Sequence, residues 1–295
     1  MNRLWTLIGS AGLLVLIGCR TIPPDSTAAL ASGIASARAQ SQEAFRAVND
    51  LVADTTLDFA ADQPILRESS FEAGLDDDSL QAWDQILGEL EKYAGHLQAL
   101  TSPELAGKFD DEAVHLAGEL NDFGQHLAQA GLEGKTPAIG FSIATSFTKL
   151  GELLIRIHAR ARARHAMTET DGELGRILRG MADSLGASQT NGVRGTVTAH
   201  WAQRMAEKKV AFLGASDHAA KRQIASDFRD MLGRRAAQDL VLISLRRSML
   251  HLASLHHALA QGESWTARSA TAAIADEIQR TRNLSSRIND KLKSE

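Results

Sequence analysis

Apolar residues recur along most of the chain at alternating spacings of three and four positions, which is the period of an amphipathic α-helix. No segment sustains the strict alternation of apolar and polar positions that is typical of a half-buried strand. The pattern therefore predicts an all-α fold, a multi-helix bundle of about eight mostly long antiparallel helices. The expected helices span about residues 26–62, 78–101, 103–131, 137–166, 170–187, 192–213, 217–261 and 264–293.

The expected helix ends coincide with residues that start or interrupt helices. Ser102-Pro103 and Thr136-Pro137 each place an N-cap residue before a proline at the first helical position. Thr170 and Glu173 have the spacing of a capping box. No proline follows Pro137 in the sequence, as long uninterrupted helices require.

Segment 217–261 has the clearest helical period. Its seam positions are Ile224, Phe228, Met231, Arg235, Gln238, Leu242, Leu245, Met249, Leu252, His256 and Leu259. Arg235 and Gln238 interrupt the seam, whereas residues 240–245 are apolar on nearly every face and are expected at the centre of the core. Because His256 is in phase with the apolar positions, we expect it to be buried with a hydrogen-bond partner.

The N-terminal segment combines a short positive start, Met-Asn-Arg, with an apolar run over residues 4–17. That run fits the ~7–15 residues of a signal-peptide core and is shorter than the ~20 residues that span a bilayer. It ends in Leu16-Ile17-Gly18-Cys19, which resembles the lipobox of bacterial lipoproteins. The resemblance covers this segment alone. It implies that residues 1–18 are a cleaved signal peptide and that Cys19 is the lipid attachment site.

In bacterial lipoproteins the cysteine thiol receives a diacylglyceryl group and its amine a third acyl chain, and two or more chains hold a protein stably on a membrane. Arg20, in place of the aspartate that marks inner-membrane retention, implies an outer-membrane lipoprotein with a periplasmic domain. Residues 19–25 would then be a lipidated tether of at most ~20 Å, stiffened by Pro23 and Pro24. Residues 26–295 would form the bundle domain.

Charge divides the chain beyond residue 18 into two unequal halves. Residues 19–150 contain 8 Lys and Arg against 21 Asp and Glu, whereas residues 151–295 contain 23 against 15. This division is compatible with an acidic sub-bundle at 26–135 and a basic one at 137–295. Either the halves pack against each other, or the basic half presents a face to an external polyanion.

One stripe of the expected third helix carries side chains that can bind metals: Asp111, His115, Glu119, Asp122 and His126. Glu112 and His115 also form one Glu-x-x-His step, which di-iron bundles use twice. No second step occurs, and charged residues are also the ordinary flank of an apolar helix seam. We therefore expect no cofactor, and His115, Glu119, Asp122 and His126 remain the candidates for a metal-binding alternative.

Arginines close the expected fourth helix. Arg156, Arg160 and Arg164 are spaced by four and would share one helix face. Cations at a helix C-terminus are favoured by the macrodipole, and that is the ordinary explanation. The functional interpretation is a face that binds lipid head groups, lipopolysaccharide phosphates or an acidic protein.

The remaining sequence features narrow the function by exclusion. A single cysteine excludes a disulfide framework, a Cys-rich zinc site and an iron–sulfur cluster. The sequence has no His-Glu-x-x-His, Gly-x-Ser-x-Gly or phosphate-loop motif, and it lacks the interleaved aromatics of single-strand nucleic-acid binders. The sequence therefore predicts a non-enzymatic envelope module, anchored to the membrane at Cys19, that binds an envelope protein or an anionic envelope component. The alternative is a bundle that binds a metal or a small ligand.

Overall fold

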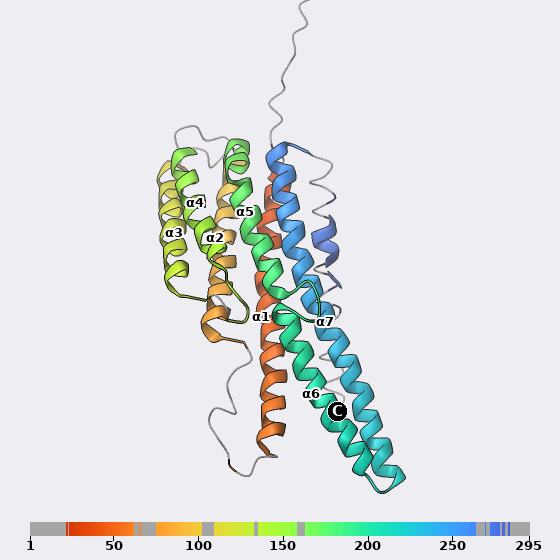
Figure 1. Cartoon of the computed structure of the whole chain (residues 1–295). Coiled ribbons are helices and arrows are strands. Elements are labelled where there is room, and N and C mark those ends of the chain that lie inside the picture. Colours follow the sequence, from red (N-terminus) through yellow and green to blue (C-terminus); the bar gives the residue numbers. More distant parts are fainter. Residues whose placement is uncertain are drawn as a thin grey trace, which may run out of the picture.

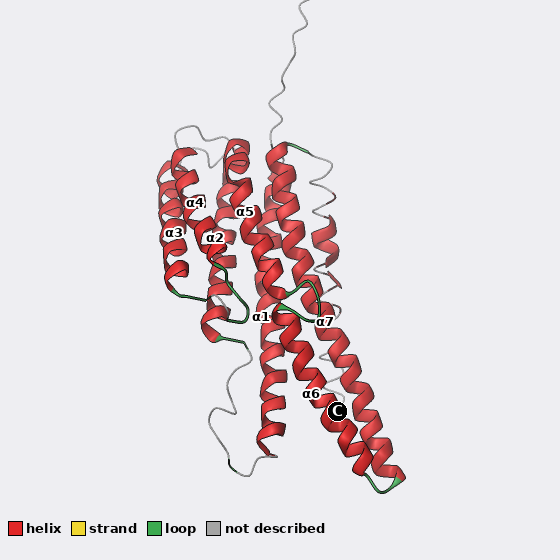
Figure 2. Cartoon of the chain, in the orientation of Figure 1, coloured by secondary structure: helices red, strands yellow, loops and turns green. Residues whose placement is uncertain are grey.

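The computed structural model of the chain describes residues 22, 24–61, 65, 75–101, 109–132, 135–157, 163–263, 269, 272–277, 279–280 and 283. Its helices are α1 (Pro24–Ala61), α2 (Asp77–Thr101), α3 (Phe109–Gln129), α4 (Phe141–Ile157), α5 (Ala163–Leu185), α6 (Gly192–Gly214) and α7 (His218–Gln261). Residues 272–277 are also helical. The described residues contain no strand, so the predicted all-α bundle is confirmed (Figure 2).

Helix α1 lies in the middle of the molecule and runs antiparallel to α7 (Figure 1). A Cβ atom placed on Gly33 of α1 would come within 2.9 Å of the Leu252 side chain, so the start of α1 lies beside the last part of α7. On one side, α1 packs against α2, which continues into the α3–α4 hairpin and α5. On the other side, α6 and α7 form a long hairpin that leaves the bundle at an angle.

The buried apolar side chains form one connected core. Its largest fully buried side chains include Trp83 and Tyr93 of α2 and Phe147 of α4. Among the described helices, none is long and apolar enough to cross a lipid bilayer.

Burial along α7 changes where the helix leaves the bundle. The seam positions of its last half are buried: Leu242, Leu245, Met249, Leu252, His256 and Leu259. Ile224 and Phe228 are only half-buried, because the first half of α7 packs mainly on α6. Leu240 is 47% exposed, so the expectation that all of residues 240–245 are central to the core is wrong at that position.

Two predicted helix starts are wrong. Helix α4 begins at Phe141 and not at Pro137, which is buried in the connection before the helix. Helix α5 begins at Ala163, so the predicted capping residue Thr170 lies inside a helix, where its hydroxyl bonds to the Ala166 carbonyl at 2.7 Å. The expected single helix over 137–166 is therefore two helices, α4 and the first turn of α5. The Ser102-Pro103 start predicted for α3 lies outside the described residues.

Candidate functional site

The predicted histidine and acid stripe lies on the outer face of α3. His115 has a side chain that is 76% exposed, and its Nδ1 is 3.5 Å from Oε1 of Glu119. Asp122 and His126 are exposed too. Glu119 is also paired with Lys92 of α2, whose Nζ lies 3.0 Å from Oε2.

Within the described part of the chain, no three His, Cys, Asp or Glu residues gather closely enough to hold a metal ion. The side chains of Asp111 and Glu112 lie outside the described residues. The metal-binding alternative therefore stays a prediction.

The three predicted arginines do not share one helix. Arg156 is exposed in the last turn of α4, Arg160 lies outside the described residues, and Arg164 belongs to α5. The Arg164 guanidinium lies against Gly262, the C-cap of α7, where the helix macrodipole favours a cation. An anion-binding role for these residues stays a prediction.

Cys19 lies outside the described residues, which begin at Ile22. Ile22 is buried against the bundle, and α1 begins two residues later at Pro24. The described residues therefore begin within the range 19–25 that the sequence predicts as the tether, and that tether stays a prediction. Three residues can span at most about 11 Å, so a lipid attached at Cys19 would be held close to the start of α1.

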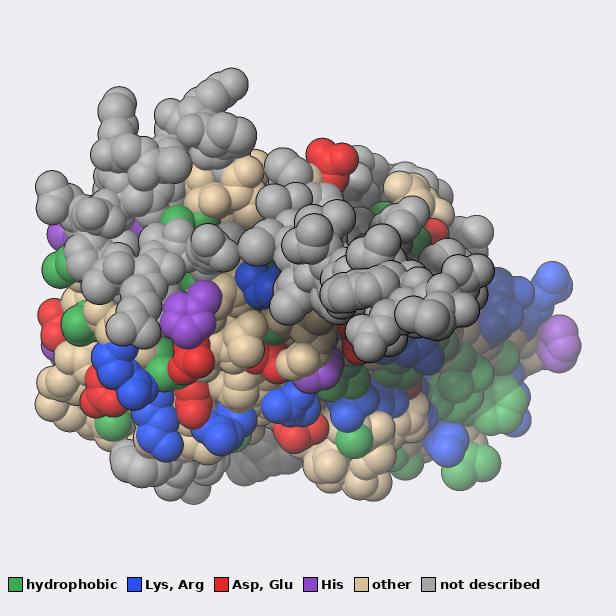
Figure 3. All heavy atoms as spheres, turned by 90° about the horizontal axis from the view of Figure 1, so that it is seen from above, with side chains coloured by type: hydrophobic (Ala, Val, Ile, Leu, Met, Phe, Trp, Pro, Cys, Tyr) green, Lys and Arg blue, Asp and Glu red, His purple; other side chains and the backbone are tan. Residues whose placement is uncertain are grey.

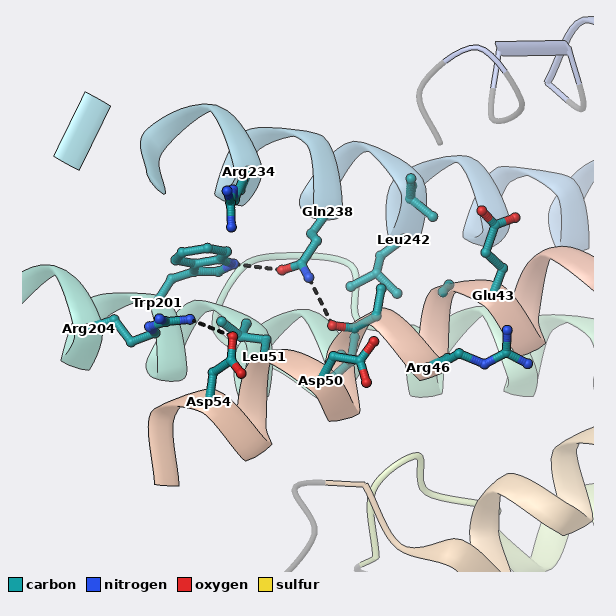
Figure 4. A pocket seen from close by; sticks show the side chains of 14 residues that line it. Glu43, Arg46, Asp50, Leu51, Asp54, Trp201, Arg204, Arg234, Gln238 and Leu242 are labelled. Carbon is teal, nitrogen blue, oxygen red and sulfur yellow. Dashed lines mark hydrogen bonds and ion pairs between the residues drawn. The ribbon is translucent and has the colours of Figure 1, made fainter. Parts of the chain in front are cut away.

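The described surface has a groove between α1, α6 and α7 (Figure 4). Its volume is about 300 Å³. The floor is formed by buried apolar side chains, which include Leu51 of α1, Trp201 of α6 and Leu242 of α7. We call this feature the α1–α6–α7 groove.

A chain of hydrogen bonds ties the three helices together at this floor. The Trp201 indole donates to Oε1 of Gln238 at 2.6 Å, and Nε2 of Gln238 donates to the Ala47 carbonyl at 3.0 Å (Figure 4). Both polar groups of the Gln238 amide are therefore used, as a polar side chain in a packed seam requires. The interruption of the α7 seam at Gln238 was the sequence signal for this floor, but the sequence did not show what the amide binds.

Charged side chains surround the apolar floor. Arg204 of α6 pairs with Asp54 and Asp58 of α1, at 3.2 and 3.6 Å. Its guanidinium also lies 5.9 Å from the centre of the Trp201 ring, within cation–π range. Arg234 projects from α7 toward the same indole (Figure 4). The indole is therefore held by the Arg204 guanidinium over its ring as well as by its hydrogen bond to Gln238.

The exposed rim on α1 is different, because its charges have no partner. Within the part of the chain that the structure describes, Glu43, Arg46 and Asp50 form no ion pair, and all three are exposed. An apolar floor with unpaired charges at its edge is a lining suited to recognition.

A second polar arrangement joins α2, α5 and α7 inside the core. The Tyr93 hydroxyl lies 2.5 Å from Oγ1 of Thr170 and 2.9 Å from Nε2 of His256. The other nitrogen of His256 lies 3.1 Å from Asp171, which also binds Nδ1 of His257 at 2.6 Å. The prediction of a buried, hydrogen-bonded His256 is confirmed.

The protonation of this network follows from its burial. Burial lowers the pKa of His256, and the carboxylate of Asp171 offsets that effect only in part. Burial also raises the pKa of Tyr93 well above its ordinary value. For Asp171, burial favours the neutral acid, but hydrogen bonds from His256 and His257 outweigh it and leave the pKa below its ordinary value. A neutral His256 can then donate a hydrogen bond from Nδ1 to Asp171 and accept a hydrogen bond at Nε2 from the Tyr93 hydroxyl. Because Tyr93 and His256 are at most 1% exposed, this network links helices and offers no open site.

No family model matches the chain, and neither a curated protein nor a solved structure is significantly similar to it. The sequence motifs and the geometry of the described residues are therefore the basis for assigning a function.

Proposed function

We propose that this chain is a lipid-anchored protein of the bacterial cell envelope whose helical bundle binds a partner protein without catalysing a reaction. Cys19 is the anchor in the outer membrane, and the bundle lies on the periplasmic side. The lipobox-like Leu16-Ile17-Gly18-Cys19 and the apolar run before it support the anchor. The α1–α6–α7 groove supports the binding role.

The observation that carries the binding role is the unpaired rim of the groove. Glu43, Arg46 and Asp50 present both signs of charge beside an apolar floor, and no described residue neutralises them. Protein interfaces combine an apolar centre with a polar rim, and rim charges steer association more than they add affinity. The partner expected from this lining is a protein segment with apolar side chains for the floor and charges of both signs for the rim.

Site-specific photocrosslinking in native membranes tests this function. A photoreactive amino acid placed at Arg46, on the rim, should give a covalent adduct of one defined mass. The same amino acid at Glu152, which is exposed on α4 and does not line the groove, is the matched control and should give none.

Charge reversal at the rim provides the second arm of the test. Because rim charges act mainly on the association rate, Arg46→Glu should reduce the yield of an adduct formed from the neighbouring position 50 and should leave the melting temperature unchanged. Equal adducts at positions 46 and 152, or no adduct at position 46, would contradict a binding role for the groove.

A further inference from the structure

The end of the α6–α7 hairpin exposes large apolar side chains to solvent. We define the hairpin tip as residues 208–222, which comprise the end of α6, the connection at residues 214–216 and the start of α7. Within it, Val210 is 69% exposed, Phe212 39% and Leu213 81%. A local group of exposed apolar side chains on an otherwise polar surface marks an interaction site.

Cations lie among these apolar side chains. The hairpin tip contains four Lys and Arg and a single Asp, a net charge of +3. Nζ of Lys221 is 5.7 Å from the centre of the Phe212 ring, so a cation and an apolar group are presented together. In the described part of the chain, Lys209, Lys221 and Arg222 form no ion pair with a carboxylate. These charges are therefore available to an external anion.

The hairpin tip is narrow and convex, and it lies far from the start of α1. Figure 1 shows the hairpin ending well beyond the α2–α5 part of the bundle. Figure 3 shows hydrophobic and basic side chains gathered at the hairpin end, on the right of that view. Because α7 has 44 residues and its last part lies beside the start of α1, the two ends are about 65 Å apart.

This shape and chemistry favour a lipid surface over a protein. A stable protein interface buries about 800 Å² on each partner, which the end of two helices with three exposed apolar side chains does not supply. A bilayer needs no complementary shape, because apolar side chains enter the boundary between head groups and acyl chains while Lys and Arg meet the phosphates.

We propose that the hairpin tip binds reversibly to a bilayer that contains anionic phospholipids. Phe212 and Leu213 enter the acyl boundary, and the cations of the tip lie at the phosphate level. One further consequence rests on the proposed function: with Cys19 anchored near the start of α1, the tip points away from the anchoring membrane. The bundle then spans about 65 Å between that membrane and the anionic surface that the tip contacts.

Vesicle binding by the unacylated mature chain tests the proposal without the lipid anchor. The chain from residue 19 with Cys19→Ser should cosediment with vesicles of equal parts phosphatidylglycerol and phosphatidylethanolamine and not with phosphatidylcholine vesicles. Rising salt should weaken binding, since charges are screened beyond about 8 Å at physiological ionic strength. Vesicle binding should weaken about 100-fold, at roughly fivefold per cation, in a triple variant with Lys209→Gln, Lys221→Gln and Arg222→Gln. Phe212→Ser with Leu213→Ser should weaken it at least tenfold.

The chain offers a matched control at a second exposed apolar and basic pair. Leu240 is 47% exposed and Arg247 is exposed seven positions later on the same face of α7, so Leu240→Ser with Arg247→Gln removes similar groups away from the tip and should leave binding unchanged. Because Cys19 is the only cysteine, the Cys19→Ser chain also accepts a single polarity-sensitive fluorophore at Ser216→Cys. Its emission should shift to the blue on anionic vesicles, whereas a label at Glu152→Cys should not shift.

Three results would overturn the proposal. The first is absence of binding by the Cys19→Ser chain, and the second is loss of binding in the Leu240 and Arg247 variant but not in the tip variants. The third is self-association that the tip substitutions abolish, which would make the tip a contact between copies of this chain. None of these results bears on acylation at Cys19 or on the adduct at Arg46, so a failure here is distinguishable from a failure of the proposed function.

Discussion

His256 shows how a polar side chain is accommodated in the core of the bundle. Its ring is 1% exposed and is hydrogen-bonded on both sides, by Tyr93 of α2 and Asp171 of α5. A buried polar group left unpaired costs about 1–3 kcal/mol, so both partners are needed. The residue therefore fixes the relative positions of three helices, and burial disfavours its protonated form.

The lowered pKa of His256 predicts that the fold loses stability in mild acid. In the unfolded chain the ring takes up a proton as the pH falls below about 6.5, whereas burial resists that proton in the folded state. The unfolded state then binds more protons, so the contribution of His256 is complete above about pH 6.5 and is lost as the pH falls below it. The expected slope for one proton is at most about 1.4 kcal/mol per pH unit.

Urea unfolding between neutral pH and pH 5 measures this slope. His256→Gln should flatten it, because no titrating ring remains at the buried position. His218→Gln removes an exposed histidine at the start of α7 and should leave the slope unchanged. An equally steep loss of stability in the His256 variant would show that another group is responsible.

At the scale of single residues, the sequence predicted the burial of His256 but not its partners. Its phase with the seam of α7 was sufficient to place it in the core. Tyr93 and Asp171 lie on other helices, and a periodic pattern along one helix carries no information about which residue of another helix it meets. The same is true of Gln238, whose position in the seam was evident but whose bonds to Trp201 and Ala47 were not.

The packing of α3 on α4 depends on glycine at their closest approach. A Cβ on Gly151 of α4 would lie 2.5 Å from the Ala117 carbonyl oxygen and 2.9 Å from the Asn121 nitrogen, both on α3. Such distances can be relieved only by moving one backbone away from the other. Gly124 of α3 is similar, because a Cβ atom there would lie only 2.6 Å from the backbone nitrogen of Thr148.

Gly151→Ala should therefore destabilise the protein, although alanine is the better helix former by about 1 kcal/mol. Overpacking costs about 1–3 kcal/mol, so we expect a net loss of roughly 1 kcal/mol in the free energy of unfolding. Gly118→Ala on α3 is the control, because nothing lies within 4 Å of its Cβ position and the substitution should stabilise by up to about 1 kcal/mol. Urea unfolding of both variants measures the difference, and a Gly151→Ala protein as stable as Gly118→Ala would refute the close approach.

At the scale of helices, periodicity predicted most elements, and local capping signals misplaced some of their starts. The predicted 192–213 and 217–261 match α6 and α7 closely, and Asp217 caps α7 by accepting the Ala220 amide at 2.8 Å. Thr170 and Glu173 have the spacing of a capping box, but both side chains form hydrogen bonds with other helices instead. Thr170 binds Tyr93, and Glu173 accepts a hydrogen bond from Ser146 of α4 at 2.8 Å. The spacing of these two side chains favoured a helix start, but residues of other helices are their hydrogen-bond partners.

For the molecule as a whole, the uneven charge of the two halves has two structural counterparts. Arg204 of the basic half pairs with Asp54 and Asp58 of the acidic half, where α6 meets α1. Exposed ion pairs of this kind contribute about 0–1 kcal/mol each to stability. They therefore do not account for the whole charge difference between the two halves. The hairpin tip carries cations that no described carboxylate neutralises. The two explanations of the charge division are therefore compatible. Some basic residues pair with the acidic half, and others remain available to an external anion.

Cys19 is the proposed lipid attachment site, and its replacement gives the prediction for the whole molecule. With Cys19→Ser, the chain in its native host should incorporate no acyl label and should keep residues 1–18, because the thiol is both the acylation site and the signal for cleavage in the lipoproteins that the motif resembles. Moving the thiol to Ser26→Cys in the same background is the control and should restore neither acylation nor cleavage. Acyl labelling at the wild-type level in Cys19→Ser would contradict the anchor. Since Ile22 is already packed on the bundle, an acylated Cys19 would hold the start of α1 within about 11 Å of the membrane and the hairpin tip far from it.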